Sequence, residues 1–133
     1  APPPYPMEIL LKSGAALLIV SLVLAWLLVA VKYLGLFNTI FVNQKYLLSA
    51  HLDYIFMAIL NWLVYTIVGH GQGNDIMAWL IVAGSVLNPL LFLFMSVKPD
   101  IKKSPFSPFG MFSSFSFMLT TAGYGWAAGV ILL

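Results

Sequence analysis

Four long apolar stretches follow one another along this chain, separated by polar segments rich in glycine, proline or lysine. A helix needs roughly 20 apolar residues to cross the hydrocarbon core of a bilayer. We therefore predict membrane-spanning helices over about residues 9–33, 46–69, 76–97 and 111–133, within one transmembrane domain that covers 1–133. The expected fold class is an all-α, integral membrane four-helix bundle.

The connecting segments agree with this division. Residues 69–75 are rich in glycine and residues 98–105 contain two prolines, which is typical of turns and loops. Residues 32–45 form a longer and partly apolar connection, which we expect to lie at the membrane interface.

The composition indicates that lipid, rather than water, surrounds most of the chain. Of its 133 residues, 62% are hydrophobic and 8% are charged, whereas soluble domains carry about 25% charged residues. The chain has no cysteine, which excludes a thiolate metal site and a cysteine nucleophile. Six lysines, four acids and no arginine form no basic cluster of the kind that binds nucleic acid.

The positions of the lysines predict the topology. Five of the six lie in segments 32–45 and 98–110, and Lys12 lies on the opposite side. Short loops rich in lysine stay in the cytoplasm. We therefore expect both lysine-rich loops to be cytoplasmic and both termini to lie outside.

Two ionisable residues, His51 and Asp53, interrupt the second apolar stretch. Such groups are costly inside a membrane, so they are candidates for function. If the helix starts near Lys45, a rise of 1.5 Å per residue places them about 9 Å and about 12 Å along it, below the interface. In the alternative, the helix starts later and both residues lie in the headgroup zone.

The face of the second helix that contains His51 is predicted to line the bundle interior. Steps of three and four residues lead from His51 to Tyr54, Ala58, Asn61 and Tyr65. Side chains at this spacing share one face of a helix. Small and polar-tipped side chains of this kind are enriched where membrane helices pack together.

Asp53 points about 200° away from His51 and is the exception on an apolar face. Steps of three and four from Asp53 reach Met57, Leu60 and Val64. We expect this acid to meet a neighbouring helix, a second subunit or a cofactor, which favours an oligomer or a larger complex. In the alternative, Asp53 is protonated or accepts a hydrogen bond from the backbone or from Ser49.

The third and fourth helices contribute further candidates. Gly84, Asn88 and Phe92 share one helix face, so Asn88 is a candidate to face the polar stripe around His51. The alternative is that this asparagine only joins helices, at about 1 kcal/mol. Tyr124, four residues after Thr120, is a candidate to reach an interior pocket.

The set of candidate residues restricts the chemistry. One intramembrane histidine is too little for a structural zinc site, which takes four ligands. The predicted spans contain no carboxylate pair of the di-iron type and no recognisable serine–histidine–acid arrangement. One histidine does suffice as the axial ligand of a haem, whose iron can act as a Lewis acid. A histidine can equally belong to a proton relay.

The run Leu48-Ser49-Ala50-His51-Leu52-Asp53 opens the second of the four predicted helices. It resembles the hydroxylaminobenzene mutase and styrene oxide isomerase family of small four-helix membrane isomerases, whose mutases carry a very similar Ser-Ala-His-Leu-acid run. In the epoxide isomerases the corresponding histidine holds a haem b near a subunit interface in a homotrimer. The iron binds the epoxide oxygen and promotes rearrangement to an aldehyde. The resemblance implies that His51 is the haem ligand.

Other positions can be placed by the same resemblance. Asn88 lies where the family has an asparagine in its third helix. Met57-Ala58 occupies the place of a usual Asn-Gly pair, and Asn61 follows one turn later. Phe92 lies near the position of a tyrosine that the epoxide isomerases use.

Three functional hypotheses follow. The first is a haem-binding membrane isomerase, a homo-oligomer in the bilayer, that acts on a small lipophilic substrate such as an epoxide. The second is a non-catalytic accessory subunit assembled with other membrane subunits, and the third is a small transporter or proton-path protein built on His51, Asp53 and Asn61. The candidate metal ligand is His51. The candidate cofactor-binding residues are His51, Asp53, Tyr54 and Tyr65, and the candidate catalytic residues are Asn61, Asn88 and Tyr124.

Overall fold

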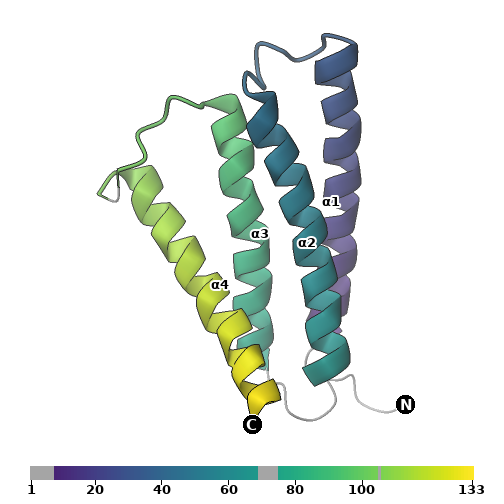
Figure 1. Cartoon of the computed structure of the whole chain (residues 1–133), viewed down its shortest axis with the longest axis vertical. Coiled ribbons are helices and arrows are strands. Elements are labelled where there is room, and N and C mark those ends of the chain that lie inside the picture. Colours follow the sequence, from purple (N-terminus) through teal and green to yellow (C-terminus); the bar gives the residue numbers. More distant parts are fainter. Residues whose placement is uncertain (1–7, 69–74, 105) are drawn as a thin grey trace.

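The structure is a computed structural model that describes residues 8–68, 75–104 and 106–133. The described residues form four α-helices, which are α1 (Glu8–Tyr33), α2 (Gln44–Val68), α3 (Asp75–Val97) and α4 (Pro108–Leu132) (Figure 1). Each is long and apolar enough to cross a membrane. The prediction of an all-α bundle of four such helices is confirmed, while residues 69–74 of the glycine-rich turn predicted over 69–75 lie outside the described residues.

Capping interactions explain why two helices begin earlier than the sequence predicted. At the start of α4, the side chain of Ser107 accepts a hydrogen bond from the backbone N–H of Gly110, and Pro108 takes the first helical position. Proline is suited to that position because its fixed φ matches the helix and no N–H is needed there. At the start of α2, the side chain of Asn43 accepts from the N–H of Tyr46 at 3.1 Å.

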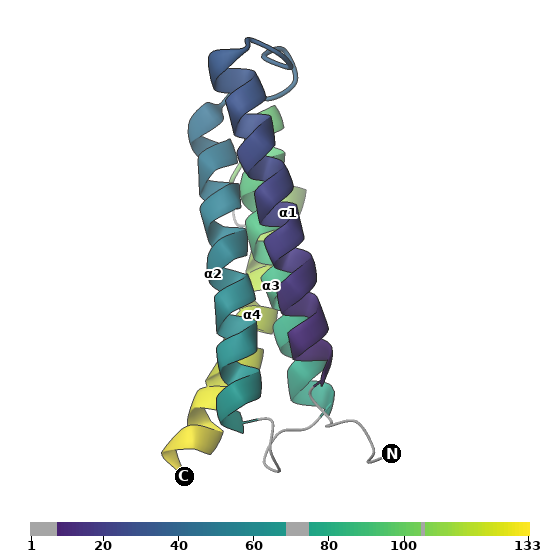
Figure 2. The same cartoon turned by 90° about the vertical axis from the view of Figure 1, so that its right-hand side faces the viewer.

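The helices alternate in direction, so both lysine-rich connections lie at one end of the bundle (Figures 1 and 2). The start of α1 and the end of α4 lie at the opposite end. α4 lies at a slant across α3, and its N-terminal end is the part of it farthest from α2 (Figure 1). The assignment of the lysine-rich end to the cytoplasm stays a prediction.

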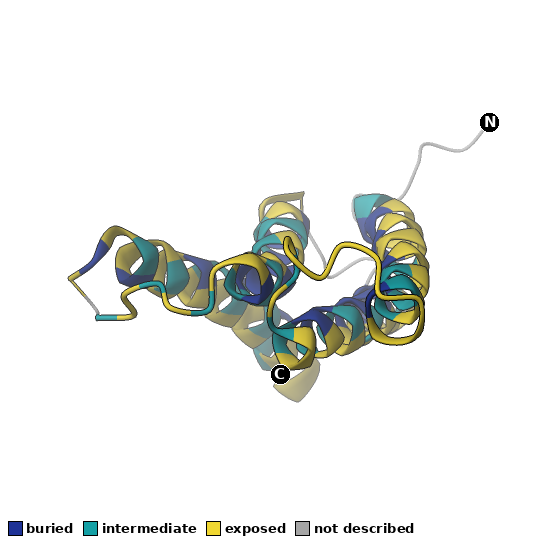
Figure 3. Ribbon diagram, turned by 90° about the horizontal axis from the view of Figure 1, so that it is seen from above, coloured by how far each residue is buried: buried dark blue, intermediate teal, exposed yellow. Residues whose placement is uncertain are grey.

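Apolar side chains lie on both the inner and the outer faces of the helices, and the buried polar side chains lie on the inner faces. Leu10, Leu17 and Leu24 follow one another at every seventh position of α1, and each is at most 4% exposed. The outward faces, which are largely coloured as exposed in Figure 3, carry large apolar side chains as well; Trp26 is 75% exposed and Phe56 is 63% exposed. A helix that is apolar on all sides belongs in lipid or in a large protein core. In this bundle the outward faces therefore suit lipid.

Glycines bring α3 and α4 into close contact. A Cβ atom added at Gly84 would lie 2.9 Å from the backbone nitrogen of Thr120, and one added at Gly123 would lie 2.8 Å from the backbone nitrogen of Ile81. Small residues at helix interfaces allow such backbone approach in membranes. These contacts hold α4 on α3 along the half of the bundle next to the C-terminus.

Candidate functional site

A buried hydrogen-bond network around Asn61 joins all four helices of the described chain. The Asn61 amide nitrogen donates to the hydroxyls of Ser13 in α1, at 3.0 Å, and Ser85 in α3, at 3.2 Å. The Tyr124 hydroxyl of α4 donates to the Asn61 side-chain oxygen at 2.5 Å. Asn61 is completely buried. Because both donors and the acceptor of its amide are engaged, Asn61 holds the helices together; we call these four residues the Asn61 network.

Asn88 joins α3 to α4. Its amide nitrogen donates to the hydroxyl of Thr120 at 2.8 Å, and its oxygen accepts from the hydroxyl of Ser116. These partners lie on α4, so the hydrogen bonds of Asn88 are not made to the polar stripe of α2. The side chain also forms part of the wall of a pocket.

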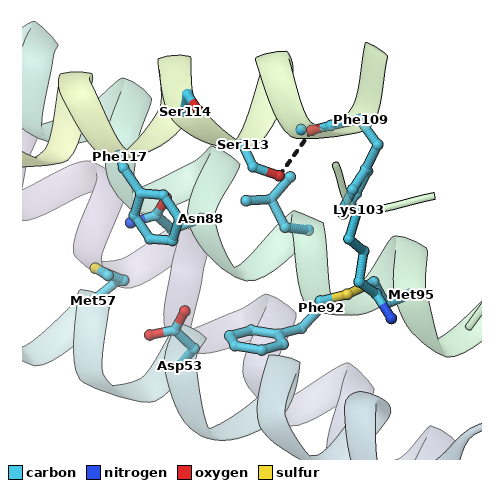
Figure 4. Close-up of a pocket in the computed structure, with 12 residues that line it drawn as sticks. Asp53, Met57, Asn88, Phe92, Met95, Lys103, Phe109, Ser113, Ser114 and Phe117 are labelled. Atoms are coloured by element: carbon cyan, nitrogen blue, oxygen red, sulfur yellow. Dashed lines mark hydrogen bonds between the residues drawn. The ribbon is translucent and has the colours of Figure 1, made fainter. Parts of the chain in front are cut away.

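That pocket, of about 500 Å³, lies between α2, α3 and the N-terminal half of α4 (Figure 4). Pockets of this size that are mainly apolar, with a few polar groups, are typical binding sites for small molecules. We call it the Asp53 pocket. Its apolar wall includes Met57, Phe92, Met95, Phe109 and Phe117, and its polar groups include Asp53, Asn88, Lys103 and Ser113.

The slant and the small residues of α4 make room for the Asp53 pocket. Gly110, Ser113 and Ser114 line it from α4 and take little space. Phe117 also lines the pocket and is 60% exposed on the outer surface of the bundle. The pocket is therefore adjacent to the apolar outer surface of the bundle.

Asp53 lies in the wall of this pocket, half-buried, with its carboxylate beside Met57 and Phe92 (Figure 4). In the part of the chain that the structure describes, its carboxylate has no hydrogen-bond or ion-pair partner. Ser49, the side chain considered as a donor, instead donates to the backbone carbonyl of Lys45. The Asp53 carboxylate is thus available to a bound molecule.

His51 lies outside the pocket, at the contact between α1 and α2. Its Nδ1 is 2.7 Å from the backbone oxygen of Ser21 and 3.3 Å from the Ser21 hydroxyl. Because a carbonyl oxygen can only accept, Nδ1 carries a proton, and in the neutral imidazole the lone pair is therefore on Nε2. Among the described residues, no hydrogen bond to Nε2 is formed. A histidine that donates one N–H to a carbonyl while the other nitrogen binds metal is the usual arrangement of metal ligands.

His51 alone can serve a metal-containing cofactor that takes only one ligand from the protein. Across residues 8–68, 75–104 and 106–133, no three His, Cys, Asp or Glu side chains gather as a metal site would require. A haem brings four of its iron ligands itself and takes one histidine from the protein. The single oriented imidazole of His51 is compatible with that requirement.

The tyrosines of α2 have other surroundings. The hydroxyl of Tyr54, a buried residue, donates to the backbone oxygen of Val86 in α3 at 3.3 Å. Tyr65 is half-buried and packs against the apolar cluster that includes Val64 and Val68. The stripe predicted to face the interior does so, since Tyr54, Ala58 and Asn61 are buried. Of the four predicted cofactor residues, Asp53 is the one that lines the pocket.

Sequence reasoning missed the contribution of α4 to the pocket. Phe109, Ser113 and Phe117 form one wall of it. They follow one another at steps of four, which is the helical spacing that could have identified a common face. The pairing of this face with Asp53 depends on the slant of α4.

Three positions that the family resemblance singled out meet in the Asp53 pocket. Met57, Asn88 and Phe92 all line it, although they come from two helices. Comparison of the chain with family models, curated proteins and solved structures finds no match. The function is therefore argued from the residues and geometry of the site.

Proposed function

We propose that this chain is a haem-binding membrane isomerase that acts on a small lipophilic substrate, such as an epoxide, in the Asp53 pocket. The observation that carries the proposal is the meeting of Met57, Asn88 and Phe92 in one pocket. In the resemblance, Asn88 matches an asparagine of the family's third helix, Phe92 lies near a tyrosine that the epoxide isomerases use, and Met57 takes the place of a usual asparagine. Asn88 and Phe92 share one face of α3, while their meeting with Met57 depends on how α2 packs against α3.

His51 is the residue that would hold the haem. The hydrogen bond from Nδ1 to the Ser21 carbonyl fixes the orientation of the imidazole, which favours metal binding through Nε2. When bound, the haem iron supplies a Lewis acid for the oxygen of the substrate.

The positions of His51 and the pocket favour a homo-oligomer. His51 contacts α1, while the Asp53 pocket faces α3 and α4 on the other side of α2. One chain therefore does not bring its own His51 to its own pocket. In a cyclic, head-to-tail oligomer, the His51 side of one protomer meets a different face of the next. The homotrimers of the epoxide isomerases are assemblies of this closed cyclic kind.

The chain's own residues suit a lipophilic substrate. Phenylalanine and methionine side chains of the pocket provide an apolar surface for the body of the molecule. Asn88 is fixed by its bonds to Thr120 and Ser116, so it forms a rigid part of the wall. The Asp53 carboxylate offers a hydrogen-bond acceptor to the polar end of the substrate. Entry from lipid is favourable because small apolar molecules partition there.

The three residues considered for a proton path lie in different surroundings. His51 bonds to Ser21, Asn61 bonds within its own network, and Asp53 lies in the wall of the pocket. An accessory subunit remains the second candidate, because the apolar outer faces also suit contact with other membrane chains.

A mixing experiment tests the proposed function. His51→Ala removes the ligand and Ser113→Trp fills the pocket, so each variant alone is expected to lose turnover of an epoxide. The two chains, carrying different affinity tags, are co-expressed and purified through both tags. If each site combines His51 of one protomer with the pocket of the next, every mixed cyclic trimer that carries both tags regains about one of its three sites.

The controls separate the alternatives. Wild-type chains with the two tags give the reference rate, and each variant paired with itself gives the background. Mixed oligomers without activity would contradict a site shared between protomers. Inactive wild-type chains that purify with different membrane proteins would support the accessory subunit instead.

A further inference from the structure

A second pocket lies at the lysine-rich end of the bundle, where α1 ends and α2 begins, and has a volume of about 390 Å³. Its polar lining consists of Lys32 and Tyr33 from α1 and Gln44 and Lys45 from α2. The ammonium group of Lys32 lies 5.5 Å from the centre of the Tyr33 ring. None of the lining residues is acidic. The pocket therefore presents two positive charges without a compensating carboxylate, and we call it the Lys32–Lys45 pocket.

The rest of this lining is apolar and lies one turn further toward the middle of the helices. Leu28 and Val29 precede Lys32 on α1, and Leu48 follows Lys45 on α2. The pocket is therefore layered, with cationic and hydrogen-bonding groups at the helix ends and aliphatic side chains below them. A phospholipid has the same order, with a polar headgroup above acyl chains.

The neighbouring loop places this end of the bundle at the membrane boundary independently of the lysines. The loop from 34 to 42 turns through positive φ angles at Gly35 and Phe37. Most of this loop is exposed (Figure 3), and several of its exposed residues have large apolar side chains. Such side chains are stabilised when they enter the boundary between headgroups and acyl chains. Each is at least 49% exposed, and they are Leu34, Leu36, Phe37, Ile40 and Val42.

We propose that the Lys32–Lys45 pocket binds an anionic phospholipid. The lipid phosphate lies between the two ammonium groups, and one acyl chain lies on Leu28, Val29 and Leu48. Basic pockets between membrane helices are suited to anionic headgroups, and each lysine near the surface contributes about 1 kcal/mol. The aliphatic side chains select a lipid over free phosphate, because they offer the soluble anion no contact. This site is separate from the Asp53 pocket and does not depend on the proposed isomerase function.

The test measures lipid affinity by native mass spectrometry of the full chain, released from neutral detergent with phosphatidylglycerol or phosphatidylcholine. The wild type is expected to bind phosphatidylglycerol more tightly than phosphatidylcholine. In the double variant Lys32→Gln/Lys45→Gln, the affinity for phosphatidylglycerol is expected to fall about 30-fold. Both lysines are exposed, so their substitution leaves the buried core unchanged.

The control is the double variant Lys98→Gln/Lys102→Gln. It removes the same charge at the same end of the bundle, from exposed residues outside the Lys32–Lys45 pocket, and is expected to change the affinity less than twofold. Equal losses in the two double variants would overturn the proposal, because they would indicate general attraction by charge. Equal affinity for the two lipids, or equally tight binding of glycerol 3-phosphate, would overturn it as well.

Discussion

Substitution of Ser113 by Trp is expected to reduce turnover by about 100-fold or more, equivalent to roughly 2.7 kcal/mol in the barrier. Ser113 lines the Asp53 pocket from α4, and its hydroxyl donates to the backbone oxygen of Phe109 in the same helix at 2.9 Å. Its loss therefore breaks no contact between helices. An indole at this position occupies the space that the substrate needs. The measurement is kcat/KM for epoxide rearrangement by purified protein.

Thr66→Trp is the matched control for this substitution. Thr66 is exposed on α2, outside the Asp53 pocket, and its hydroxyl also donates to a backbone oxygen one turn earlier, that of Trp62. We expect Thr66→Trp to keep the wild-type kcat/KM. A Ser113→Trp protein that is folded and fully active would show that the substrate does not use this pocket.

Asn61→Leu is expected to cause the largest loss of stability, about 2 kcal/mol in the free energy of unfolding. Hydrogen bonds between membrane helices average about 0.6 kcal/mol and reach about 1.7, and this substitution removes three of them. Ser13 and Ser85 keep backbone acceptors at Leu10 and Val82. The Tyr124 hydroxyl keeps a weaker contact, 3.6 Å from the Met57 sulfur.

The free energy can be measured by reversible unfolding in mixed micelles with increasing dodecyl sulfate. Thr66→Leu, which places the same side chain on the outer surface, is expected to change it by less than about 0.5 kcal/mol. Equal stability of Asn61→Leu and wild type would mean that the Asn61 network does not hold the bundle together. Haem binding should survive in Asn61→Leu, because His51 is oriented by Ser21 rather than by this network.

The helices and the polar stripe could be predicted because they depend on local properties of the chain. Length and apolarity determine the helices, and the 3.6-residue period determines which side chains share a face with Asn61. The partners of Asn61 could not be predicted, since Ser13, Ser85 and Tyr124 come from three other helices. Helices that are apolar on all sides carry little information about which face meets which neighbour.

Asn88 illustrates the same difficulty. The sequence made it a candidate to face the stripe on α2, whereas its hydrogen bonds are made to Thr120 and Ser116 on α4. The reason is the close contact at Gly84, one turn earlier on the same face, where the backbone of Thr120 lies 2.9 Å from the position that a Cβ atom would take. Glycine spacing indicates that a close contact is possible, but it does not identify the partner helix.

The proposed binding of haem by His51 is tested most directly by an absorption spectrum. Wild type, His51→Ala and His70→Ala are expressed with supplied haem and purified in detergent with their native lipids. His70→Ala is the control, because His70 is the second of the chain's two histidines. We expect a strong haem band at the blue end of the visible spectrum in wild type and His70→Ala, and its loss in His51→Ala. A colourless wild type, or a band that survives in His51→Ala, would contradict the account.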